Sequence, residues 1–85
     1  MSQEPTKRQQ TNAENYYKAA CKFLHEHIEE ICTDPIERHC AVKTISDTLA
    51  FFSRVNIIND EQHKFLVTAL NECLEYEIHE FNEKE

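Results

Sequence analysis

Apolar residues recur every three or four positions along most of the chain, which is the spacing of an amphipathic helix. Over residues 12–31 these positions form one stripe, and charged residues occupy the opposite side. The stripe consists of Ala13, Tyr17, Ala20, Leu24, His27 and Ile31. The pattern predicts a first helix at residues 12–31, preceded by a disordered polar tail at residues 1–11.

Two further helical segments follow, and each has a recognisable start. Asp34 stands directly before a proline, which is typical of a capped first turn. The helix after it has a broad apolar arc, so we expect it to be the most enclosed element. Asn59 or Asp60 caps a third helix, and Gln62 is placed to form a capping box with Asn59. This helix is predicted to end near residue 82.

The links between the three segments are short, which makes consecutive helices antiparallel. The chain has no glycine, and the usual two-residue hairpin turns depend on glycine, which argues against a compact β fold. We therefore expect an all-α protein with a single domain at residues 12–85. Its predicted architecture is a small up-down-up bundle of three helices.

The third segment is apolar over more than half of its circumference, and two neighbouring helices would not cover such an arc. Because a core of this size is marginal on its own, we expect a homodimer that associates through this helix. The alternative is that some of these side chains are simply exposed. The residues assigned to self-association are Phe51, Leu66, Tyr76 and Phe81.

Two polar residues interrupt the apolar faces. His27 lies in the stripe of the first helix, and Glu77 lies in the apolar arc of the third. In an up-down-up bundle these two helices are parallel, so the residues come to similar heights. A buried carboxylate is costly unless it is paired. We therefore predict a buried polar pair of His27 and Glu77, with Arg38 as a second possible partner of the carboxylate.

The sequence carries no evident catalytic or metal-binding motif. Without glycine, the phosphate-binding loops, the dinucleotide fingerprint and the nucleophile elbow are excluded. Cys21 with His25 is only a fragment of a nucleophilic pair or of a zinc site, and His39 with Cys40 is only a fragment of a zinc site. We predict no enzyme, no cofactor and no metal. With a polar N-terminus and no export or membrane segment, the four cysteines are interpreted as free thiols of a cytoplasmic protein.

The negative charge is concentrated in the last third of the chain. Residues 60–85 carry eight carboxylates against two lysines, and so supply most of the formal net charge of −7. The polar side of the third helix carries Glu61, Glu72, Glu75 and Glu83. Such a row is either a solvated face or a surface for a basic partner, and we assign these four residues to partner binding.

These features together predict a non-enzymatic interaction protein that binds and modulates or inhibits a basic, nucleic-acid-handling protein. A phage-type inhibitor of a host or defence protein is its most concrete form. The charge argues against direct binding of nucleic acid. One alternative is a structural or regulatory homodimer that docks through apolar surface, and a less favoured one is a metal- or pH-sensing bundle.

Overall fold

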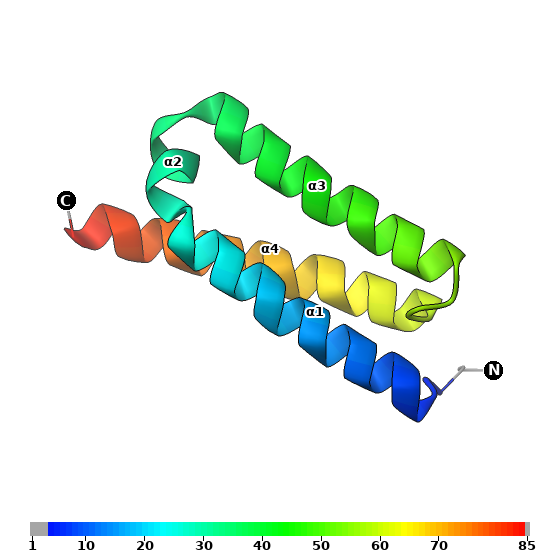
Figure 1. Cartoon of the computed structure of the whole chain (residues 1–85). Coiled ribbons are helices and arrows are strands. Elements are labelled where there is room, and N and C mark those ends of the chain that lie inside the picture. The colour runs from blue at the N-terminus through cyan, green and yellow to red at the C-terminus, as the bar shows by residue number, and fades with distance from the viewer. Residues whose placement is uncertain (1–3, 85) are drawn as a thin grey trace.

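The structure is a computed structural model that describes residues 4–84. Its regular elements are the helices α1 (Lys7–Glu26), α2 (Ile28–Thr33), α3 (Pro35–Arg54) and α4 (Asp60–Lys84). Helices α1 and α4 run in the same direction, α3 runs back in the opposite one, and the short α2 connects α1 to α3 (Figure 1). The predicted all-α class is confirmed, but the described residues form four helices instead of three.

Helix α1 begins inside the segment that was predicted to be a tail. Thr6 Oγ1 accepts a hydrogen bond from the N–H of Gln9 at 3.1 Å, and Gln9 Oε1 accepts one from the N–H of Thr6 at 3.0 Å. This capping box gives hydrogen-bond partners to two backbone N–H groups at the start of the helix. The prediction of disorder was therefore wrong for residues 7–11. Residues 1–3 of the predicted tail, and Glu85 of the predicted domain, lie outside the described residues.

The start of α1 is also tied to a distant part of the chain. The side-chain amide of Gln9 donates to the carbonyl of Asn56 at 3.2 Å, and that of Asn12 donates to the carbonyl of Ile57 at 3.0 Å. Both carbonyls belong to the link between α3 and α4. Polar residues thus anchor this turn, which explains why an argument from apolar spacing placed the helix start five residues too late.

The predicted first helix is also interrupted at His27, where the backbone (φ −108°, ψ 17°) leaves helical geometry. Helix α1 ends just before this residue and α2 begins just after it. Ile31 of α2 packs in a buried cluster with Leu24 of α1 and Ala41 of α3. The bend brings the end of α2 to a point where the chain reverses into α3 across a single residue, Asp34.

The predicted caps of the two later helices are present. Asp34 Oδ1 accepts a hydrogen bond from the N–H of Ile36 at 2.9 Å at the start of α3. At the start of α4, Asn59 Oδ1 accepts from the N–H of Gln62 at 2.8 Å, and Gln62 Oε1 accepts from the N–H of Asn59 at 2.9 Å. Asn56 in the link has a positive φ of 65°, a conformation that asparagine adopts more readily than most residues. This residue turns the chain where glycine would be usual.

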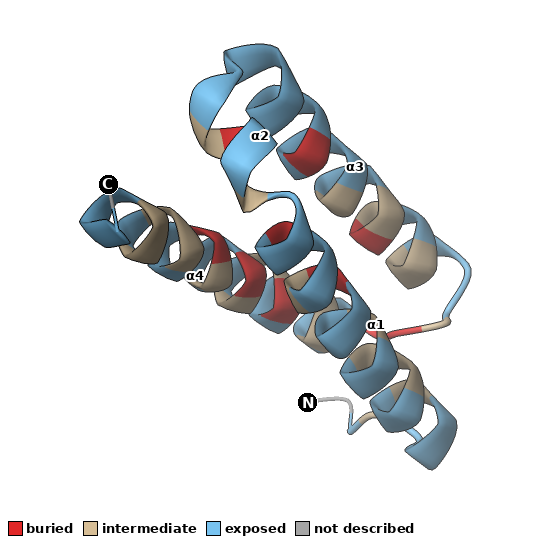
Figure 2. Ribbon diagram, turned by 60° about the vertical axis from the view of Figure 1, so that its left-hand side comes forward, coloured by how far each residue is buried: buried red, intermediate tan, exposed pale blue. Residues whose placement is uncertain are grey.

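Helix α4, and not α3, is the central element. It packs against each of the other three helices. Its leucines Leu66, Leu70 and Leu74, four residues apart, are all buried. In Figure 2 the buried residues face the space between the helices, and the outer side of α3 is largely exposed. The expectation that α3 would be the most enclosed helix was wrong, because part of its broad apolar arc faces solvent.

The core has two adjoining clusters. The one at the α2 end includes Leu24, Ile31, Ala41 and Leu74. The other includes Ala20, Leu49, Ile58, Leu66 and Leu70. At this second cluster, the Tyr16 ring of α1 meets the Phe52 ring of α3 edge to face, with centroids 5.2 Å apart. Ile58 shows that the α3–α4 link contributes to the core as well as turning the chain.

The buried position of Ile58 leads to a stability prediction. Its side chain is 0% exposed, whereas Val55, three residues earlier, is 44% exposed. Replacing a fully buried isoleucine by alanine removes apolar contacts and leaves a cavity, so we expect Ile58→Ala to lower the free energy of unfolding by about 2–5 kcal/mol. Urea unfolding measures this loss. Val55→Ala is the control and should lose far less; equal losses would contradict the described link.

Candidate functional site

The predicted partner-binding carboxylates lie together on the outer face of α4. At about 100° per residue, the four positions fall within about 80° of one another around the helix axis. All four side chains are exposed, and together they are called the acidic ridge: Glu61, Glu72, Glu75 and Glu83. The leucines that face the core occupy the opposite side of α4. Burial of that side is what holds the ridge towards solvent.

Near the C-terminal end, the acidic ridge includes a histidine contact. His79 Nε2 lies 3.6 Å from Glu83 Oε1, one helical turn away, and both side chains are mostly exposed. An exposed pair of this kind contributes little to stability. A histidine therefore lies beside the carboxylate at this end of the ridge, whereas Glu72 and Glu75 lie side by side in its middle.

A strip of exposed aromatic residues runs beside the acidic ridge, along the seam between α1 and α4. Phe65 is 69% exposed and Tyr76 is 61% exposed. Together with Tyr17 of α1, they line two adjoining hollows of about 540 and 510 Å³. Tyr17, Phe65 and Ala69 line both hollows, so we treat the two as one surface and call it the aromatic groove.

Two thiols lie beside the aromatic groove. Cys21 on α1 lies next to Cys73 on α4 and to the Tyr17 hydroxyl, and its proximity raises the pKa of Tyr17. Burial raises the pKa of Cys73 to about 12, and the contact with Cys21 and the charge of Glu77 add to this. Cys73 is therefore a protonated thiol that fills space in the seam and is poorly suited to act as a nucleophile.

Glu77 is paired, but with a different histidine from the one predicted. Its carboxylate oxygens lie 2.5 and 3.2 Å from Nδ1 of His25. The Glu77 side chain is only 11% exposed, whereas that of His25 is 74% exposed. His27 lies at the bend and is exposed; its ring packs on Phe23, with centroids 4.5 Å apart. The predicted pair of His27 and Glu77 was therefore wrong, because the bend removes His27 from the face directed at α4.

The residues assigned to self-association do not form one surface. Leu66 is buried in the core, so its assignment to an interface was wrong. Phe81 is half-buried near the end of α4, and Phe51 and Tyr76 are exposed. Phe51 lies near the end of α3, against its neighbour Phe52, while Tyr76 lies in the aromatic groove. Leu66 also lines the aromatic groove, but it is only 2% exposed, and Phe51 and Phe81 do not line this groove.

Phe65 and Tyr17 belong to the candidate surface but were not predicted as site residues from the sequence. Phe65 was not recognised as part of the apolar arc of α4, and Tyr17 was assigned to the core-facing stripe of α1. Both are exposed and line the aromatic groove. Around the α4 axis, Phe65 lies only about 40° from Glu61 and about 20° from Tyr76. A strip of aromatic residues bordering an acidic row was the signal that could have found this surface.

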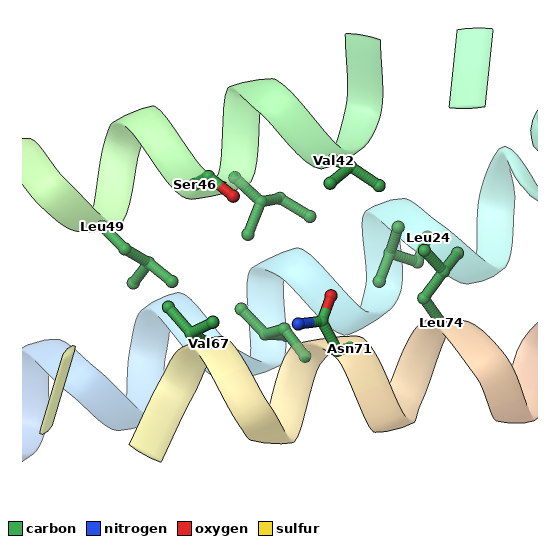
Figure 3. Close-up of a pocket in the computed structure, with 9 residues that line it drawn as sticks. Leu24, Val42, Ser46, Leu49, Val67, Asn71 and Leu74 are labelled. Carbon is green, nitrogen blue, oxygen red and sulfur yellow. The ribbon is translucent and has the colours of Figure 1, made fainter. Parts of the chain in front are cut away.

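The hollow between the three long helices is small. A cavity of about 20 Å³ lies between α1, α3 and α4, with the polar side chains of Ser46 and Asn71 among mostly apolar lining residues (Figure 3). This volume suits about one water molecule, and ligand sites are typically larger by an order of magnitude. Within residues 4–84, no cluster of three or more His, Cys, Asp or Glu side chains is arranged to hold a metal ion. None of the helices in this range has the length and apolar character needed to cross a membrane.

Comparison of the chain with protein-family models, with curated proteins and with solved structures finds no match. Function is therefore inferred from the residues and from their geometry. The acidic ridge and the aromatic groove beside it are the surface features with a defined chemistry.

The pairing of Glu77 with His25 is expected to stabilise the seam between α1 and α4. Glu77→Ala removes a mostly buried, hydrogen-bonded carboxylate, and we expect a loss of about 1 kcal/mol, or about 4–8 °C in Tm for a domain of this size. Thermal unfolding followed by circular dichroism measures it. Glu83→Ala removes an exposed carboxylate of the same helix and is the control. If the two variants have the same Tm, the pair of Glu77 and His25 does not stabilise the fold.

The raised pKa of Cys73 predicts selective thiol chemistry. An acid whose pKa is raised stays protonated at higher pH, and only the thiolate reacts rapidly. At pH 8, we expect iodoacetamide to modify the exposed Cys40 well before Cys73 in the folded protein. Peptide mapping by mass spectrometry measures both rates, and unfolding in urea should remove the difference. Equal rates in the folded protein would contradict the described seam.

Proposed function

We propose that this protein is a non-enzymatic interaction protein of the cytoplasm that binds a basic, nucleic-acid-handling protein and modulates or inhibits it. The acidic ridge makes the contact and occupies surface on the partner that otherwise binds phosphate. The observation that carries this proposal is the exposure of all four ridge carboxylates on one face of α4. The four free cysteines are typical of a reducing compartment and support the cytoplasmic location.

The rigidity of α4 supports the proposal. At about 1.5 Å per residue, Glu72 and Glu83 are about 16 Å apart along the axis, which is enough to span several backbone phosphates. The start of the helix is fixed by the capping box of Asn59 and Gln62, and its inner side is buried against three helices. A preformed row of carboxylates avoids most of the ordering entropy that a flexible acidic tail would lose on binding.

Electrostatics supports the same type of partner. The chain has a net charge of −7, and four of its exposed carboxylates lie on one face of α4. This charge attracts a surface rich in Lys and Arg over distances of about a Debye length. Complementary charge mainly accelerates association, so binding through the ridge should be sensitive to salt. The same charge repels nucleic acid, so the proposed ligand is the protein and not the nucleic acid that the protein handles.

A second candidate is a regulatory homodimer that associates through apolar surface. The exposed side chains of Phe51, Phe65 and Tyr76 favour it, since each leaves a large apolar area in contact with water. Sedimentation equilibrium of the full chain distinguishes the candidates: a mass near 10.1 kDa supports the heterologous partner, and twice that mass supports the homodimer.

Charge reversal on the acidic ridge tests the leading proposal. We expect Glu72→Lys with Glu75→Lys to leave the fold intact, because both side chains are exposed. The same change should weaken binding to the partner by about tenfold or more, mainly through the association rate and most at low salt. The partner is captured with the wild-type chain from a lysate of the native host, and kinetics are measured by biolayer interferometry.

A matched control separates the ridge from net charge. Glu26→Lys with Glu29→Lys makes the same change in net charge at the same three-residue spacing, on exposed positions of α1 and α2. It should change the affinity much less than the ridge variant. The captured partner should also bind nucleic acid, and this protein should compete for that binding. A ridge variant that binds the partner as the wild type does would refute the proposal.

A further inference from the structure

The aromatic groove is a continuous surface with a definite length and with walls of known structure. It extends along α4 from Gln62 to Tyr76, which is about 21 Å at 1.5 Å per residue. Its two walls are the parallel helices α1 and α4 (Figure 1). The exposed rings of Phe65 and Tyr76 are its largest apolar contacts with water. A length of about 21 Å corresponds to a helix of about four turns.

The walls determine what kind of segment fits. The backbone N–H and C=O groups along helices are hydrogen-bonded within each helix. An extended segment docked here would gain no strand pairing, and its own backbone groups would lose water without replacement. A helix satisfies its own backbone and needs only apolar side chains to pack into the groove. The geometry therefore favours a helix in the groove.

The charges at the groove determine the sign of the charge that a partner must carry. The charged side chains that line its two hollows are Glu14 on α1 and Glu72 on α4. Lys18 follows Glu14 by one turn and lines neither hollow. The acidic ridge continues the negative charge along the α4 side. Two copies of this chain meeting face to face would bring these carboxylates together, so charge complementarity favours a basic partner over a second copy.

We propose that the aromatic groove binds a basic amphipathic helix of about four turns that belongs to the partner protein. Apolar side chains of that helix pack on Phe65 and Tyr76, and its lysines and arginines meet Glu14, Glu72 and the acidic ridge. This inference rests on the proposed function, because it names the element through which the basic partner docks. Tyrosines that pack into the centre of an interface, as Tyr76 would here, are typical of the residues that dominate binding energy.

Three synthetic peptides of about 16 residues test the inference against the full chain. The first has leucines at i, i+3, i+4 and i+7 spacing and lysines elsewhere. The second has the same composition in scrambled order, so it keeps the charge and loses the apolar stripe. The third keeps the leucine stripe and carries glutamates in place of lysines. Fluorescence anisotropy measures each Kd, and we expect the first peptide to bind about tenfold more tightly than either control.

Variants of the protein show where the first peptide binds. Phe65→Ala with Tyr76→Ala removes the exposed rings, and because both are solvent-facing the thermal melt should not change. We expect this variant to lose the preference for the striped peptide over the scrambled one, a loss of about tenfold. Phe51→Ala removes a ring on α3 that is 50% exposed and lies outside the groove, and it should change the Kd by less than about twofold.

The outcomes separate the groove from the ridge. If both basic peptides bind equally, and Phe65→Ala with Tyr76→Ala has no effect, the groove proposal is overturned while binding through the ridge stands. If neither basic peptide binds, or if Glu72→Lys with Glu75→Lys leaves their binding unchanged, the proposed function fails as well. Equal binding of the acidic peptide, or a dimer that the aromatic substitutions dissociate, would assign the groove to an apolar partner or to a second copy.

Discussion

The burial of one side of α4 against the other three helices is the constraint on which the rest of the structure depends. Leu66, Leu70 and Leu74 lie four residues apart and fill the space between α1, α2 and α3. Because a helix turns by about 100° per residue, the burial of these leucines also sets the direction in which every other residue of α4 points from the helix axis. The acidic ridge is therefore held towards solvent by the same packing that stabilises the fold.

The surface along α1 and α4 combines two features that usually occur apart. Carboxylates form a row on the outer side of α4, and Phe65 and Tyr76 lie beside them in an open groove. Exposed aromatic rings oppose solubility, and clustered carboxylates repel one another, so neither feature is explained by stability alone. A partner that supplies an apolar stripe with basic flanks would satisfy both. This combination favours a heterologous partner over a solvated face or a self-associating one.

Apolar spacing and capping residues predicted most of the fold, and the differences have physical causes. The all-α class and the caps at Asp34 and Asn59 depend on local chemistry and were correct. The start of α1 was misplaced because Gln9 hydrogen-bonds to Asn56, a contact that no local pattern contains. At the candidate site, the exposure of the ridge followed from helical period, whereas the choice between His25 and His27 depended on a bend set by tertiary packing. The groove forms only where two helices lie side by side, and the apolar pattern of a single helix does not show which helix lies next to it.

Binding is proposed to use the outer side of α4 and the adjoining side of α1. An amide chemical-shift titration of the isotope-labelled protein with the striped basic peptide tests this most directly. The perturbed amides should follow α4 from Glu61 to Glu83 and continue onto α1 around Tyr17. The outer side of α3, around Phe51, should remain unperturbed. Perturbations centred on α3, or spread evenly over all four helices, would contradict it.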